Sequence, residues 1–228
     1  MTTTQKPIKL NLRIARKVLS TVDAGLVRGL GKPIPGQMCV EAAVNYAIGN
    51  KHGDDPKCVG KAVRDFKIKL NDCDWSSNEA RTEGMRRLAI AQLGSDSLDQ
   101  MEFGKLLFLR GTQQLLSWVF RQEAKRLKDK KLDDLASRME QAQSFDEARS
   151  VAKDAYTYAY TCAYAYAYTY TYAYAYAYAS TYAYAYDAAY AYAKRGDKLL
   201  RITAQVGLDV LIEMKSPGCK WLWLCDEE

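Results

Sequence analysis

The residues best suited to chemistry lie in the turn-rich stretch NKHGDDPKC, which holds the single histidine of the chain, His52. With Cys58 in the same stretch and Cys39 upstream, imidazole and thiolate groups provide the ligand types that zinc prefers. The same thiols with His52 and an acid such as Glu41 are the components of an activated thiol nucleophile. No CxxC or HxxxH pair supports either site. We therefore interpret these residues as a turn loop with buried structural thiols, and keep zinc as the alternative.

Five basic residues form a second candidate group. Lys57, Lys61 and Arg64 follow one stripe of a predicted helix, and Arg86 with Arg87 lies in the next predicted helix. Guanidinium and ammonium groups that converge bind anions through charge-assisted hydrogen bonds. The spacing predicts a possible anion contact, which depends on how the two helices pack.

Paired carboxylates occur near the C-terminus, where Asp209 and Glu213 stand one helical turn apart. Arg201 and Gln205 continue the same stripe, so a polar helix face explains the pair more simply than acid–base catalysis does. The chain contains no phosphate-binding loop, dinucleotide fingerprint or nucleophile elbow. These patterns favour a non-enzymatic protein, with a small enzyme or ligand-binding module at residues 37–93 as the alternative.

The composition is that of a globular protein of 228 residues, with 48% hydrophobic and 26% charged residues. A net charge of +6 permits an anionic partner such as nucleic acid, but the charge is spread along the chain. The N-terminus has no apolar segment of signal-peptide length, and no apolar run reaches the roughly 20 residues that span a bilayer. The six cysteines are then expected to be reduced thiols in a cytoplasmic protein.

Helical periodicity dominates the chain outside its turns. Val59, Val63, Phe66 and Leu70 recur along one face of a predicted helix. We expect helices over residues 8–31, 37–49, 59–70, 75–94, 97–120 and 197–215, separated by glycine, proline and asparagine turns such as KPIPG. The predicted fold is all-α.

Local signals refine these boundaries. Ser76 with Glu79 and Ser144 with Glu147 predict capping boxes at two helix starts. Gly111 predicts a possible break in the helix over 97–120. The charged stretch 121–143 predicts a solvated helix or connector. The expected organisation is a helical domain over 1–120, a charged connector over 121–143, and a tyrosine-rich helical segment with a C-terminal helix and aromatic tail over 144–228.

Residues 156–192 alternate tyrosine with alanine and hold all but one of the 17 tyrosines, each at an even position. As a strand the tract would extend about 120 Å, and it lacks the glycine, proline and asparagine residues that favour turns. As a helix it starts from a capping box, is rich in alanine and ends at Gly196. We expect a helix, with a β-hairpin around Ala179–Thr181, and hence an α+β fold, as the alternative.

In a helix the tyrosines form two opposed ridges separated by alanine grooves. One ridge begins with Tyr156, Tyr160, Tyr164, Tyr168, Tyr172 and Tyr176, and the other with Tyr158, Tyr166, Tyr170, Tyr174 and Tyr178. Tyrosine rings provide large contact area at low entropic cost. The tract is therefore predicted to be a packing or contact surface, although simple repeat expansion would give the same register.

The segments GKPIPGQMCVEAAVNYAIG, WSSNEARTEGMRRLAIAQLGSD and LIEMKSPGCKWLWLC resemble those of uncharacterised bacterial and mobile-element proteins. Those proteins are alanine-rich and helical, and some are loosely described as putative immunity proteins. The strict tyrosine alternation departs from their pattern. The resemblance implies helices and a partner-binding role and carries over no catalytic residues. We therefore expect binding to another protein or self-association, and no membrane partner.

Overall fold

The computed structural model describes residues 9–161 and 196–227. These residues contain nine α-helices and no strand longer than an isolated bridge, which confirms the all-α prediction. The α-helices are α1 (Leu12–Asp23), α2 (Val40–Ile48), α3 (Lys61–Asn71), α4 (Asn78–Ala91), α5 (Gln100–Gly111), α6 (Ser117–Leu127), α7 (Lys130–Gln141), α8 (Phe145–Thr161) and α11 (Asp197–Glu213). Shorter helical segments are η1 (Ser95–Ser97), η2 (Thr112–Leu116) and η3 (Pro217–Asp226).

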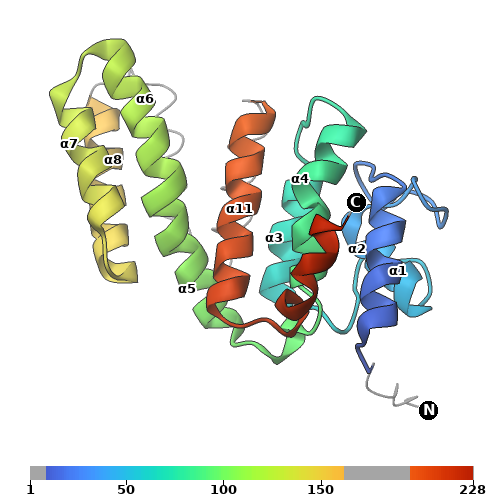
Figure 1. Cartoon of the computed structure of the whole chain (residues 1–228). Helices are drawn as coiled ribbons and strands as arrows, with labels where there is room; N and C mark the ends of the chain where they lie inside the picture. The colour runs from blue at the N-terminus through green and yellow to red at the C-terminus, as the bar shows by residue number, and fades with distance from the viewer. Residues whose placement is uncertain (1–8, 162–195, 228) are drawn as a thin grey trace.

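The helices stand side by side, with α1 and α2 at one end of the molecule and α6, α7 and α8 at the other (Figure 1). Helix α11 lies between these ends and packs against α3, α4 and α5. The C-terminal helix therefore shares a core with helices of the first 120 residues.

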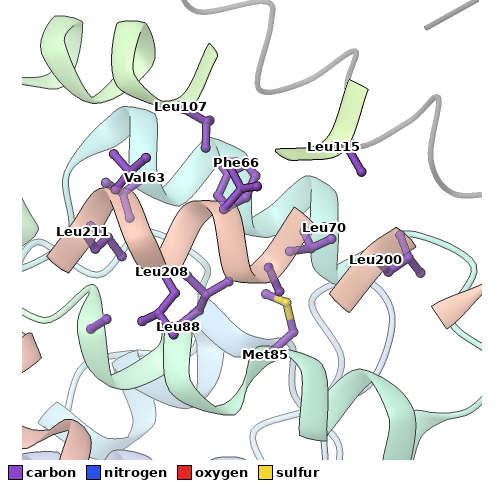
Figure 2. Packing of buried hydrophobic residues seen from close by; sticks show 14 of the residues in the cluster. Val63, Phe66, Leu70, Met85, Leu88, Leu107, Leu115, Leu200, Leu208 and Leu211 are labelled. Carbon is purple, nitrogen blue, oxygen red and sulfur yellow. The ribbon is translucent and has the colours of Figure 1, made fainter. Parts of the chain in front are cut away.

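The centre of this core is formed by α3, α4 and α11. Leucines of α4 and α11 pack around Val63, Phe66 and Leu70 of α3 (Figure 2). Phe66 lies directly over Gly207 of α11, where a Cβ atom would come within 2.4 Å of the ring. The missing side chain lets α3 and α11 approach closely. Burial of the Val63, Phe66 and Leu70 side chains confirms the predicted apolar stripe.

The first helix is shorter than its apolar pattern predicts. Helix α1 ends at Asp23, and Gly25 follows with φ +119°, a conformation that residues with side chains rarely adopt. Residues 26–38 then form an irregular loop instead of a continued helix, closed by isolated bridges from Leu26 and Gly31 to Met38. Apolar spacing alone could not show that Gly25, and not Gly29, ends the helix.

The two capping boxes differ in outcome. Helix α4 is capped by Ser77, whose Oγ accepts from the backbone N–H of Ala80, so the prediction of Ser76 as cap is wrong by one residue. Ser76 instead donates its backbone N–H to Asp197 at the start of α11. At α8 the predicted Ser144 cap is confirmed, because the backbone N–H of Glu147 donates to Ser144 Oγ at 3.2 Å. The Glu147 carboxylate accepts from the backbone N–H of Gln143, the residue before the cap.

The predicted break at Gly111 is a π-helical turn, η2, which joins α5 to α6 without interrupting the helix. The charged stretch 121–143 also differs from the expected solvated connector. The chain reverses at Lys128, and α7 buries Leu132, Leu135 and Met139. Arg121 of α6 forms ion pairs with Asp133 and Glu140 of α7. These ion pairs connect the two packed helices on their outer faces.

The aromatic tail forms η3 and lies against α4 and α1. Trp221, Leu222 and Leu224 are buried, and Gly218 meets the backbone of α4 so closely that a Cβ atom would lie 2.1 Å from a carbonyl oxygen. Arg86 donates to the backbone carbonyl of Cys225 at 2.5 Å. The tail is thus a fixed part of the N-terminal core.

Candidate functional site

The predicted residues Cys39 and Cys58 lie in the interior, together with Glu41 in the first turn of α2. Two residues that sequence reasoning did not select, Lys67 of α3 and Gln92 at the C-terminal cap of α4, complete the group. We call these five residues the buried polar centre. Three different helices hold its carboxyl, amine and amide groups in an otherwise apolar core.

The Lys67 and Glu41 side chains are both fully buried, and Lys67 Nζ lies 3.2 Å from Glu41 Oε1. Burial is the largest influence on both groups because the low dielectric disfavours their charged forms. It raises the pKa of Glu41 above its usual range and lowers the pKa of Lys67 below its own, while their mutual attraction opposes both changes. Burial thus acts against the charged form of each group, while the contact between them acts in favour of the charged forms.

Hydrogen bonding at the buried polar centre is incomplete. The Gln92 amide is fully buried and interacts with the Glu41 carboxyl. However, the contacts of Glu41 with Lys67 and Gln92 fall short of full hydrogen-bond geometry. Both Glu41 oxygens, Lys67 Nζ and both polar atoms of the Gln92 amide have no hydrogen-bond partner among the described residues. Such buried, unsatisfied groups cost about 1–3 kcal/mol each, which requires an explanation.

The thiols of the centre are poor nucleophiles in this environment. Burial raises the pKa of both Cys39 and Cys58 to about 11. Because the thiolate is the reactive form, both groups are held as unreactive thiols near neutral pH. The five described cysteines are all free of disulfide bonds, as the sequence predicts.

His52 does not join the thiols. Its ring is exposed, and its Nε2 lies 3.1 Å from the carbonyl oxygen of Gly31. No group of three or more His, Cys, Asp and Glu side chains within residues 9–161 and 196–227 has a geometry suited to a metal ion. The described residues therefore do not assemble the zinc site of His52, Cys58 and Cys39 that the sequence offered as an alternative.

Each of the five basic residues of the predicted anion contact pairs with a carboxylate of the chain. The pairs are Lys57 and Arg64 with Asp55, Lys61 with Asp65, Arg86 with Asp23, and Arg87 with Asp226. Arg86 and Arg87 thereby fasten α4 to α1 and to the tail. An external anion would have to displace these carboxylates.

The first tyrosines of the tract lie on α8. Tyr156 and Tyr158 are half-buried against the core, and Tyr158 donates its hydroxyl to Asp129 Oδ2 at 2.9 Å. Lys131 lies 5.0 Å from the Tyr158 ring centroid, a cation–π contact. Tyr160 belongs to the same helix. The remaining predicted contact residues, Tyr164, Tyr166, Tyr168, Tyr170, Tyr172, Tyr174, Tyr176 and Tyr178, lie outside the described residues.

A second candidate site is the loop of residues 26–38, which we call the apolar loop. It is held from several sides: Leu26 N–H donates to Thr82 Oγ1 at 2.8 Å, and Gly29 N–H donates to Asp72 Oδ1 at 2.8 Å. Lys32 N–H donates to the Gln37 carbonyl at 2.6 Å across the turn. These bonds fix the backbone of the loop before any partner binds.

The turn of the apolar loop requires Gly31. This residue has φ +71°, and a Cβ atom there would lie 2.0 Å from the Gln37 carbonyl oxygen. The turn presents Leu30 and Ile34 to solvent, with 42% and 49% of their surface exposed, beside the exposed prolines Pro33 and Pro35. A rigid backbone that displays aliphatic side chains in this way is suited to insertion into an apolar pocket of another protein.

A sequence signal for Lys67 was present. It follows Val63 by four residues and therefore lies on the stripe that buries Phe66 and Leu70. A lysine on an apolar helix face requires a buried partner, and Glu41 within the apolar segment CVEAAV was the acid available. Gln92 gave no comparable signal because it lies next to a helix end, where polar residues are common.

No helix in the described part of the chain is long and apolar enough to cross a membrane. The search of protein-family models, of curated proteins and of solved structures gives no match to the chain. What the described residues do show is an all-α protein with a buried polar centre and an exposed apolar loop.

Proposed function

We propose that this protein is a non-enzymatic helical protein that acts by binding another protein. The observation that carries the proposal is the apolar loop, a backbone fixed by hydrogen bonds that exposes Leu30 and Ile34. Because the loop is ordered before binding, association loses little conformational entropy at this surface. The low nucleophilicity of the buried thiols supports the non-enzymatic part of the proposal.

The tyrosine–alanine tract is the second proposed contact surface, as its composition predicts. The resemblance to alanine-rich helical proteins makes a toxin or a component of a defence system, in the bacterial cytoplasm, the most specific form of the partner. Self-association is the other form that the proposal includes.

The test compares a double variant of the apolar loop with a matched surface variant. Leu30→Asp with Ile34→Asp places charge on the loop, and Ile212→Asp changes a side chain of similar exposure, 46%, on α11. We expect partner proteins to be retained by the wild type and by the Ile212 variant but not by the loop variant. Sedimentation over a range of concentrations tests self-association with the same set. Equal retention and equal size for all three proteins would contradict a role for the loop.

The ligand-binding alternative over residues 37–93 is favoured by one observation, the unsatisfied groups of the buried polar centre. Metal analysis of the purified protein separates it from the leading proposal, since a zinc site would lose its metal in His52→Ala. Nucleic-acid binding is a third and weaker candidate, because the basic residues already pair with carboxylates. Retention on nucleic acid that persists near physiological salt would favour it.

A further inference from the structure

The side chains of Lys67, Glu41 and Gln92 share three properties. All three are fully buried, they come from three different helical segments, and their polar atoms lack hydrogen-bond partners among the described residues. Glu41 contacts both other members, with Lys67 Nζ at 3.2 Å from its carboxyl and the Gln92 amide beside the same group. The carboxyl therefore contacts both an amine and a primary amide.

From this arrangement we propose that Lys67 and Gln92 join in an intramolecular amide bond, with Glu41 as the acid–base group. The lysine amine is a nucleophile only in its neutral form, which desolvation in an apolar interior favours. The carboxyl can donate a proton to the amide that is attacked and receive one from the attacking amine. Lys67 and Gln92 share a contact with the Glu41 carboxyl, and confinement of two reacting groups to one small region acts as a high effective concentration, which compensates for the low reactivity of an amide.

The reaction balances without an oxidant or a cofactor. Lys67 Nζ forms a bond to Gln92 Cδ, and the bond from Cδ to Gln92 Nε2 breaks. The amine loses one proton to the Glu41 carboxylate, the departing nitrogen gains one from the carboxylic acid, and one molecule of ammonia leaves. Glu41 ends in the protonation state in which it began.

The product would also satisfy the groups that are unsatisfied before it forms. The new secondary amide has one N–H donor and one carbonyl acceptor, and a neutral Glu41 offers one acceptor and one donor to match them. A buried amine, which is costly to desolvate, disappears. Ordered water could satisfy the same atoms without a bond, and this is the competing explanation.

The mass of the purified full-length chain decides between these explanations. After denaturation, the wild type is expected to weigh less than its sequence by one ammonia molecule. Proteolysis should release a branched peptide that joins the segment around Lys67 to the segment around Gln92. A wild-type chain with the full mass of its sequence would overturn the proposal.

Variants assign the bond to its residues. Lys67→Met and Glu41→Gln should restore the full mass, and Gln92→Glu should change the lost molecule from ammonia to water, because a carboxyl then replaces the amide. Loss of ammonia that persists in Lys67→Met would instead indicate a cyclised asparagine elsewhere and refute the assignment. A wild-type bridge that maps to Glu41 would refute it as well. The wild-type measurement stands even where a variant fails to fold.

Discussion

The buried pair of Lys67 and Glu41 predicts opposite responses to pH when either member is removed. In Lys67→Met, Glu41 stays fully buried without its amine partner. Its folded pKa, already above its ordinary value of 4.5, rises further because the attraction of Lys67 is lost. The folded state then binds more protons than the unfolded state, so stability is highest below about pH 4.5 and decreases as the pH rises.

The second variant, Glu41→Gln, leaves Lys67 buried without its acid. The folded pKa of Lys67, already below its ordinary value of 10.5, falls further. The unfolded state then binds more protons, so stability is highest above about pH 10.5 and decreases as the pH falls. While one proton separates the two states, the slope is about 1.4 kcal/mol per pH unit for each variant, with opposite signs.

The cost of each single change is large because one buried titratable group loses its partner in a dry interior. Removing one member of a buried pair destabilises by about 3–5 kcal/mol, whereas replacing both by neutral groups is often tolerated. Urea unfolding between about pH 5 and pH 9, followed by circular dichroism, measures the slopes. The double variant Glu41→Gln with Lys67→Met is the reference, since it has neither titrating group. Equal pH slopes in all three variants would show that neither side chain is held away from its ordinary pKa.

Two glycines give further predictions from close packing. Gly84→Ala brings a Cβ atom within 2.2 Å of the Trp75 ring, so we expect a loss of about 1–3 kcal/mol in the free energy of unfolding, while Gly53→Ala, which meets no atom within 4 Å, should change little. Equal stabilities of the two variants would contradict the Trp75 contact. Gly218→Ala should displace the aromatic tail from α4 by its clash with backbone atoms, and a red shift of tryptophan fluorescence would report the exposure of Trp221. An unshifted spectrum would contradict the observed position of the tail.

The parts of the fold that sequence predicts well are those where two local signals agree. Helix α2 combines a run of apolar residues with Gly49 at its end, and α11 combines an apolar stripe with the Ser216–Pro217–Gly218 stop. Residues 121–143 show the opposite case. Charged residues dominate their composition, yet Leu132, Leu135 and Met139 lie on one helix face. The packing of α7 on α6 and α8 shows that this face is buried.

The candidate sites depended more strongly on tertiary structure. Sequence offered Cys39 or Cys58 with His52 and Glu41 as a possible group; the two thiols and Glu41 are buried, whereas His52 is exposed. Lys67 and Gln92 approach them through the packing of α2, α3 and α4, which no local spacing encodes. The chemistry of the site changed accordingly, from a thiol or metal centre to a buried carboxyl, amine and amide.

The positions of α8 and α11 bear on how the tyrosine-rich stretch could vary. Helix α8 is packed on α5 and α7, and α11 on α3, α4 and α5, so each end of the intervening residues 162–195 is fastened to the body by its own contacts. The contacts that hold α8 and α11 on the body are made by these two helices themselves, so they do not depend on the number of two-residue repeats in the sequence between them.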